Sequence, residues 1–175
     1  MIQVISTLAN RWIMKQYKTF YELGEPLSMD EKEALRSYFD PDLLARTRKI
    51  FLDKIHPLDF LTKIRLSLLK FMFRIRGLAG LTLIDCVFLK SGFWSADPQM
   101  VRSILFHELV HVTQYDLLGS GEFIRRYFQS WQDNGFSYEK ISFERVAYGL
   151  THHYETFPKR PFLVKEKVLQ GFEIR

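Results

Sequence analysis

The amino-acid sequence predicts an α+β domain that is mainly α-helical and carries a small antiparallel or mixed sheet. Apolar residues recur at helical spacing over most of the chain, whereas two short segments rich in β-branched and aromatic residues indicate strands. The 175 residues are 47% hydrophobic and include 16 Phe, which is ample material for one core. Neither a repeat nor a flexible linker divides the chain. We therefore expect residues 1–175 to form a single domain.

The first 45 residues form a predicted helical N-terminal part. Residues 1–21 carry apolar side chains at helical spacing with basic residues between them, which indicates an amphipathic helix. Docking of this helix against the domain is the favoured interpretation, and contact with a membrane surface is the alternative. Ser28 and Glu31 have capping-box spacing, which predicts a helix over residues 29–39. Asp40-Pro41 interrupts that helix.

Two strands and one helix are expected in the middle of the chain. Residues 49–55 alternate loosely and indicate a strand that ends at His56-Pro57, and residues 58–76 have helical spacing. The apolar, β-branched centre of residues 77–92 lies between glycines and indicates a second strand. This second strand comes shortly before the most informative motif of the sequence.

The positive charge is concentrated in one segment. The formal net charge is +5; residues 36–76 hold ten Lys/Arg against four Asp/Glu, a net +6, which leaves 15 against 16 elsewhere, a net −1. Such a segment can attract anionic partners, but its apolar interleaving is more typical of helices with basic edges. No nucleic-acid-binding motif accompanies it, so we expect no nucleic-acid partner.

The sequence HELVH at residues 107–111 matches the HExxH zinc motif. Residues four apart lie above one another on a helix, so the imidazoles of His107 and His111 can converge on one zinc ion. Glu108 can then reach a water molecule bound to the metal. The spacing therefore predicts two metal ligands and a catalytic carboxylate on one helix.

The flanking sequence predicts that helix and its burial. Asp97 is a suitable N-cap followed by Pro98 at the first helical position, and Gly119 follows the last periodic residue. An apolar stripe beside the two histidines indicates a substantially buried helix. Burying one carboxylate and two imidazoles costs several kcal/mol unless each has a partner, and zinc with its water would partner all three.

A catalytic zinc site needs a third protein ligand, for which Glu144 is the favoured candidate. Residues from Ser142 onward have helical apolar spacing with Glu144 on the flank, and the small Ala147 would let this helix approach the motif helix closely. Glu144 comes 33 positions after His111, which leaves room for an intervening helix over about 122–132 and a turn. His152 and His153 are the alternative ligands, and a surface Glu144 paired with a nearby cation stays open.

The motif HELVH, the later FERVAY and the preceding strand resemble the gluzincin metallopeptidases in a compact form. The run ILFHELVHVTQ at residues 104–114 also resembles small HExxH domains of bacterial proteins, and the likeness covers roughly residues 78–157. It implies a zincin-like helical domain with a catalytic core over about 46–157 and a C-terminal extension over 158–175.

The resemblance also implies roles for individual residues. His107, His111 and Glu144 would hold the zinc, and Glu108 would be the general base. An edge strand within residues 77–89 would pair with the backbone of a peptide substrate. The residues that could stabilise the oxyanion are Tyr138, Tyr148, His152 and Tyr154, and the resemblance does not distinguish among them.

These observations together predict a zinc metallopeptidase with one Zn²⁺ per chain and a peptide or protein substrate. The alternative is a catalytically silent protein that zinc stabilises for binding or scaffolding. Cys86 is the one cysteine, so neither an internal disulfide nor a cysteine-based zinc site is available. The N-terminal sequence does not resemble a signal peptide and no apolar stretch is long enough to span a membrane, so we expect a cytoplasmic protein.

Overall fold

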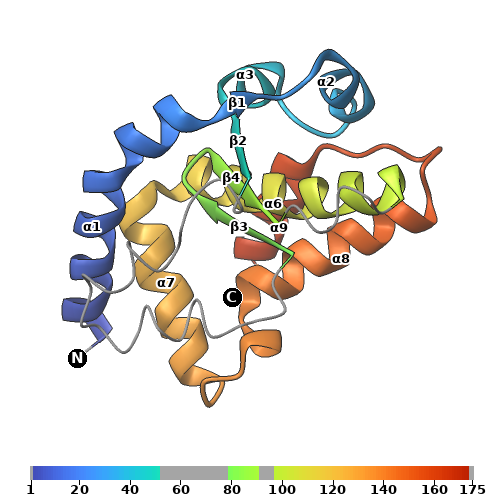
Figure 1. The fold of residues 1–175 in the computed structure, drawn as a ribbon. Coiled ribbons are helices and arrows are strands. Elements are labelled where there is room, and N and C mark those ends of the chain that lie inside the picture. The colour runs from blue at the N-terminus through green and yellow to red at the C-terminus, as the bar shows by residue number, and fades with distance from the viewer. Residues whose placement is uncertain (1, 52–78, 91–96, 174–175) are drawn as a thin grey trace.

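The structure is a computed structural model that describes residues 2–51, 79–90 and 97–173. Its helices are α1 (Ile2–Leu23), α2 (Met29–Leu35), α3 (Pro41–Arg46), α6 (Pro98–Leu118), α7 (Ser120–Asp133), α8 (Ser142–Thr156) and α9 (Val164–Glu173), with a short 3₁₀ helix, η3 (Tyr138–Lys140). The strands are β1 (Glu25–Pro26), β2 (Arg48–Phe51), β3 (Gly80–Leu83) and β4 (Cys86–Leu89). This mainly helical chain with a small mixed sheet confirms the predicted α+β class (Figure 1).

The four described strands form one sheet in the order β1-β2-β4-β3. β2 pairs parallel to β4, whereas β1 with β2 and β3 with β4 are antiparallel. β2 confirms the start of the strand expected over 49–55, whose last residues lie outside the described part, as does the helix expected over 58–76. β3 ends the sheet among the described strands, with one edge unpaired by any of them.

The single strand expected over residues 77–92 is wrong, because the segment forms a hairpin of β3 and β4. Leu83 pairs with Cys86, and the two residues between them make the turn. Ile84 adopts a φ of 62°, a region that a β-branched residue rarely occupies. The turn is held from outside, because Asp85 is buried and accepts a hydrogen bond of 3.1 Å from the Tyr17 hydroxyl.

Helix α6 packs against strands β3 and β4 and against helices α7, α8 and α9, near the middle of the molecule (Figure 1). It begins and ends as predicted: the Asp97 side chain accepts a hydrogen bond of 2.9 Å from the backbone N–H of Gln99, and Gly119 follows the helix with a φ of 72°. Every residue from 105 to 115 is buried. A helix buried on all sides carries its polar side chains into the interior, so they need partners there.

The N-terminal part packs as expected. α1 lies along α7 and buries Ala9, Ile13 and Phe20, which agrees with docking against the domain. Ser28 and Glu31 form the predicted capping box at the start of α2. No described helix combines the length and hydrophobicity that crossing a membrane would require.

Two helices were not expected from the sequence. α3 follows directly after Asp40, where Pro41 starts a new helix instead of only ending the previous one. α9 lies in the predicted C-terminal extension, yet it packs against α6, and Val164 and Val168 are fully buried in the core. The extension therefore contributes to the core that surrounds α6.

Candidate metal centre

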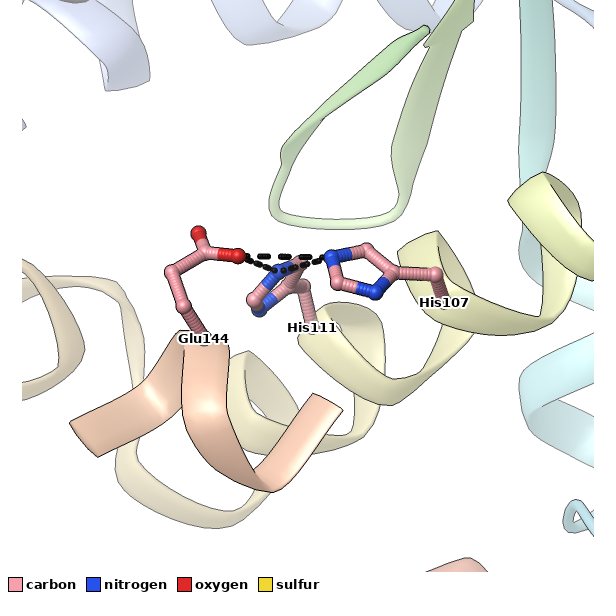
Figure 2. A group of neighbouring side chains, drawn as sticks. All are labelled: His107, His111 and Glu144. Atoms are coloured by element: carbon pink, nitrogen blue, oxygen red, sulfur yellow. Dashed lines mark hydrogen bonds and ion pairs between the residues drawn. The ribbon is translucent and has the colours of Figure 1, made fainter. Parts of the chain in front are cut away.

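Helices α6 and α8 bring the three predicted ligands together (Figure 2). His107 and His111 lie one turn apart on α6, and Glu144 lies in the first turn of α8. The two histidine Nε2 atoms are 3.2 Å apart, and Glu144 Oε2 lies 3.3 Å from His107 Nε2 and 3.4 Å from His111 Nε2. Among the described residues this is the one group of His, Cys, Asp and Glu side chains with metal-ligand spacing.

The three atoms form a nearly equilateral triangle that fits a metal ion. The edge of a tetrahedron is about 1.6 times the distance from its centre to a corner, so edges of 3.2–3.4 Å correspond to bonds of about 2.0 Å. Two neutral imidazoles with facing Nε2 lone pairs repel at this distance, so a proton or a cation must lie between them. The site could therefore hold a metal ion.

Burial makes a partner necessary for Glu144. Only 4% of its side chain is exposed, and Oε2 has no hydrogen-bond donor among the described residues. Burial opposes ionisation of Glu144, but His111 and His107 outweigh it and hold the pKa of this carboxyl far below its usual value. Burial also disfavours a charged His111, yet Glu144 raises its pKa to about 9. In the metal-free chain, charged His111 and ionised Glu144 therefore form a buried ion pair.

A second layer of hydrogen bonds orients two of the ligands, and the sequence did not reveal it. His111 Nδ1 lies 2.8 Å from Gln114 Oε1, and Gln114 Nε2 donates to the carbonyl oxygen of Phe143 at 3.1 Å. The Tyr127 hydroxyl, on α7, donates to Glu144 Oε1 at 2.7 Å. Gln114 could have been noticed as an amide within an apolar run, one turn after His111, whereas nothing local marks Tyr127.

Glu108 lies apart from this triangle, against strand β3. Its Oε2 accepts a hydrogen bond of 2.6 Å from the Thr82 hydroxyl. Glycine at position 80 lets the Glu108 side chain lie this close to β3, because a Cβ at that position would be 2.5 Å from Glu108 Oε1 and 2.8 Å from its Cγ. Burial raises the pKa of Glu108, although the nearby His111 and His107 and the bond from Thr82 act in the opposite direction. Glu108 therefore holds a proton more readily than an ordinary carboxylate does.

Two of the four residues proposed for the oxyanion lie at this centre. The Tyr148 ring centroid is 4.5 Å from that of His107, and the Tyr148 side chain is half exposed. Burial and the nearby charge of Glu144 raise the pKa of Tyr138. Tyr154 instead stacks on Phe106 at 4.3 Å in the core, and the exposed His152 is outside the ligand group.

Several other downstream side chains with ligand chemistry contact residues outside this group. The His153 ring packs against Phe157 and Phe162, and neither His152 nor His153 belongs to the group of close ligand atoms. Four downstream carboxylates pair with other residues: Asp116 with Arg46, Glu122 with Arg125 and Arg126, Asp133 with Gln129, and Glu155 with Ser103. Glu144 is thus the third member of the described group.

Comparisons with protein-family models, curated proteins and solved structures find no match for this chain. The function of this chain must therefore be inferred from the residues of this site. What these residues establish is a buried group of two histidines and one glutamate that could hold a metal ion.

Proposed function

We propose that the protein is a zinc-dependent hydrolase, and more narrowly a metallopeptidase of the gluzincin type. The observation that supports this most strongly is the buried triangle of His107 Nε2, His111 Nε2 and Glu144 Oε2. Three protein ligands around a position for water are the arrangement of catalytic zinc sites, whereas structural zinc sites use four protein ligands.

The donor set and the distances favour zinc over other metals. Imidazole nitrogens disfavour Mg²⁺ and Ca²⁺, which take oxygen ligands. Iron(II) also binds two histidines and one carboxylate, but it does so in octahedral sites. Neighbouring ligands in an octahedron with bonds of about 2.1 Å are about 3.0 Å apart, closer than the 3.2–3.4 Å seen here. The tetrahedral interpretation therefore fits better.

Glu108 is the proposed general base. Zinc in this site would polarise a bound water molecule and lower its pKa to about 7. Glu108 would take a proton from that water as it attacks a carbonyl carbon and would later pass the proton to the leaving amine. A carboxylate whose pKa burial has raised suits both steps, because it binds the proton more strongly and still releases it.

A peptide is the proposed substrate because of where Glu108 lies. The carboxylate contacts β3, whose outer edge is unpaired among the described strands. An extended peptide can add to such an edge through main-chain hydrogen bonds. This would bring a peptide backbone beside the proposed base.

The test compares wild type with Glu108→Gln and His111→Ala. Metal content is measured by elemental analysis, and hydrolysis by mass spectrometry of a broad peptide library with and without a chelator. We expect wild type to contain one zinc and to cleave peptides in a chelator-sensitive way. Glu108→Gln should keep the zinc and lose cleavage, and His111→Ala should lose both. The exposed Glu166→Gln on α9 is the matched control for Glu108→Gln and should behave as wild type.

Three outcomes contradict the proposal in different ways. Full cleavage by Glu108→Gln would exclude this residue as the base. Zinc binding without cleavage in wild type would favour the zinc-stabilised binding or scaffold protein. Iron instead of zinc in the purified chain would exclude a zinc hydrolase.

A further inference from the structure

We infer that Gln114 is a positioning residue that fixes the tautomer of His111 and ties its ring to the segment that carries Glu144. This inference deepens the proposed function and rests on it, because it concerns how the metal ligands are oriented. Gln114 lies three residues after His111 and is completely buried. Its two polar atoms have one partner each, on two different helices.

The orientation of the Gln114 side-chain amide follows from its two partners, His111 and Phe143. The carbonyl oxygen of Phe143 can only accept, so the Gln114 atom 3.1 Å away must be the NH₂ group. Gln114 Oε1 is then the atom that faces His111 Nδ1, at 2.8 Å. An amide oxygen can only accept, so Nδ1 must carry a proton. The opposite nitrogen, Nε2, points at His107 and Glu144, and it offers its lone pair to a metal when it carries no proton.

The same side chain connects both halves of the ligand set. Phe143 directly precedes Glu144 in the first turn of α8, while His111 is on α6. The buried Gln114 amide therefore links the His111 ring to the backbone of the residue that precedes Glu144. Outer hydrogen bonds of this kind commonly change metal affinity by 10–100-fold when they are removed. A buried amide that served packing alone would change affinity only through the stability of the fold.

Two substitutions separate these roles. Gln114→Glu keeps an acceptor for the His111 Nδ1 proton and replaces the donor to Phe143 with an oxygen that repels its carbonyl. Gln114→Met has a similar length and removes both hydrogen bonds. Both variants should lower the unfolding temperature of the metal-free chain, because each leaves the buried Phe143 carbonyl without this donor. Only Gln114→Met should lose the bond that orients His111.

The experiment measures zinc affinity by competition with a chromophoric chelator, together with the unfolding temperature of each metal-free chain. We expect Gln114→Met to bind zinc 10–100-fold more weakly than wild type, and Gln114→Glu to stay within a few-fold of wild type despite its lower unfolding temperature. The exposed Gln99→Met on the same helix is the control and should change neither value. Wild-type affinity in Gln114→Met, or equal losses in both variants, would overturn the inference.

A second measurement needs no metal and keeps the two proposals distinguishable. ¹⁵N-resolved NMR of the metal-free chain should show a slowly exchanging proton on His111 Nδ1 in wild type and Gln114→Glu, and rapid exchange in Gln114→Met. If wild type lacked this protected proton, the tautomer assignment would be wrong even if zinc bound. If wild type bound no zinc but showed the proton, the proposed function would fail while the hydrogen bond stood.

Discussion

Replacing Gly80 with Ala tests whether Glu108 must lie where the structure has it. The new Cβ would be 2.5 Å from Glu108 Oε1 and 2.8 Å from both Cδ and Cγ, all well inside van der Waals contact. Rotation of the carboxylate alone cannot relieve a clash that includes Cγ. Either the whole Glu108 side chain moves by roughly 1 Å, or β3 retreats from α6 and stretches the bond from Thr82.

The expected magnitudes come from this geometry. Overpacking a buried position costs about 1–3 kcal/mol, and the lower chain entropy of Ala in the unfolded state returns about 0.4–1 kcal/mol. We therefore expect a net loss of about 1–2 kcal/mol in the free energy of unfolding. A displacement of about 1 Å at a catalytic group can cost about 100-fold in rate. Zinc binding should persist, because the ligand triangle does not include Glu108.

The assay compares the Gly80→Ala variant with Gly149→Ala in α8, where a Cβ would meet no atom within 4 Å. Chemical denaturation gives the free energies of unfolding, elemental analysis the zinc content, and cleavage of a peptide found in the library screen the rate. Gly149→Ala should be slightly stabilised, since Ala favours a helix over Gly by up to about 1 kcal/mol. Unchanged stability and cleavage in Gly80→Ala would show that Glu108 does not need this position, and loss of zinc would show that the ligands depend on β3.

Three further changes test other contacts of the site and the core. Tyr127→Phe removes the donor to Glu144 Oε1 and should weaken zinc binding by about 10-fold in the chelator competition. Tyr154→Phe is the control, because Tyr154 lies outside the ligand group, and it should bind zinc as wild type does. Equal zinc affinities of the two variants would refute the role of Tyr127. His111 has a pKa raised from 6.5 to about 9, so the stability that charged His111 gives to the folded chain is fully present below pH 6.5 and is lost as the pH rises through 9. The unfolding temperature of the metal-free chain should fall over that range, while the affinity for zinc rises. A flat temperature profile would argue against the ion pair with Glu144. Val168 is fully buried, so Val168→Ala should lower the free energy of unfolding by roughly 2 kcal/mol in chemical denaturation. Leu169 is 40% exposed, so Leu169→Ala should lower it little. Equal small losses in both variants would place α9 outside the core.

The parts of the fold that could be predicted are those determined by neighbours in the sequence. The limits of α6 follow from Asp97, Pro98 and Gly119, and the pairing of His107 with His111 follows from helical spacing. Glu144 could be predicted because a glutamate on the flank of an apolar helical stripe can face inward. The buried Ala147 agrees with the close packing of α8 on α6.

The parts that were missed depend on the tertiary structure. The hairpin turn contains Ile84 at a positive φ instead of the Gly or Asn that marks such turns, so the sequence looks continuous there. Phe143 lies 29 residues from Gln114, and Glu144 lies 17 residues from Tyr127, so no local pattern joins the members of these two pairs. Gly80 is informative only once β3 is known to pass against Glu108.

The environments of the two buried glutamates support different roles for them. Glu144 lies between two imidazoles and a tyrosine hydroxyl, which keep its pKa low, so it stays charged, as a metal ligand must. Glu108 accepts one hydrogen bond, from the Thr82 hydroxyl, and lies against β3; burial raises its pKa, although the nearby His111 and His107 and the bond from Thr82 act in the opposite direction. Two carboxylates whose pKa values are shifted in opposite directions within one site are a feature of acid–base catalysis. A site built only to stabilise the fold would have no need for a carboxyl like Glu108, because burying it without the metal costs stability and gains one hydrogen bond.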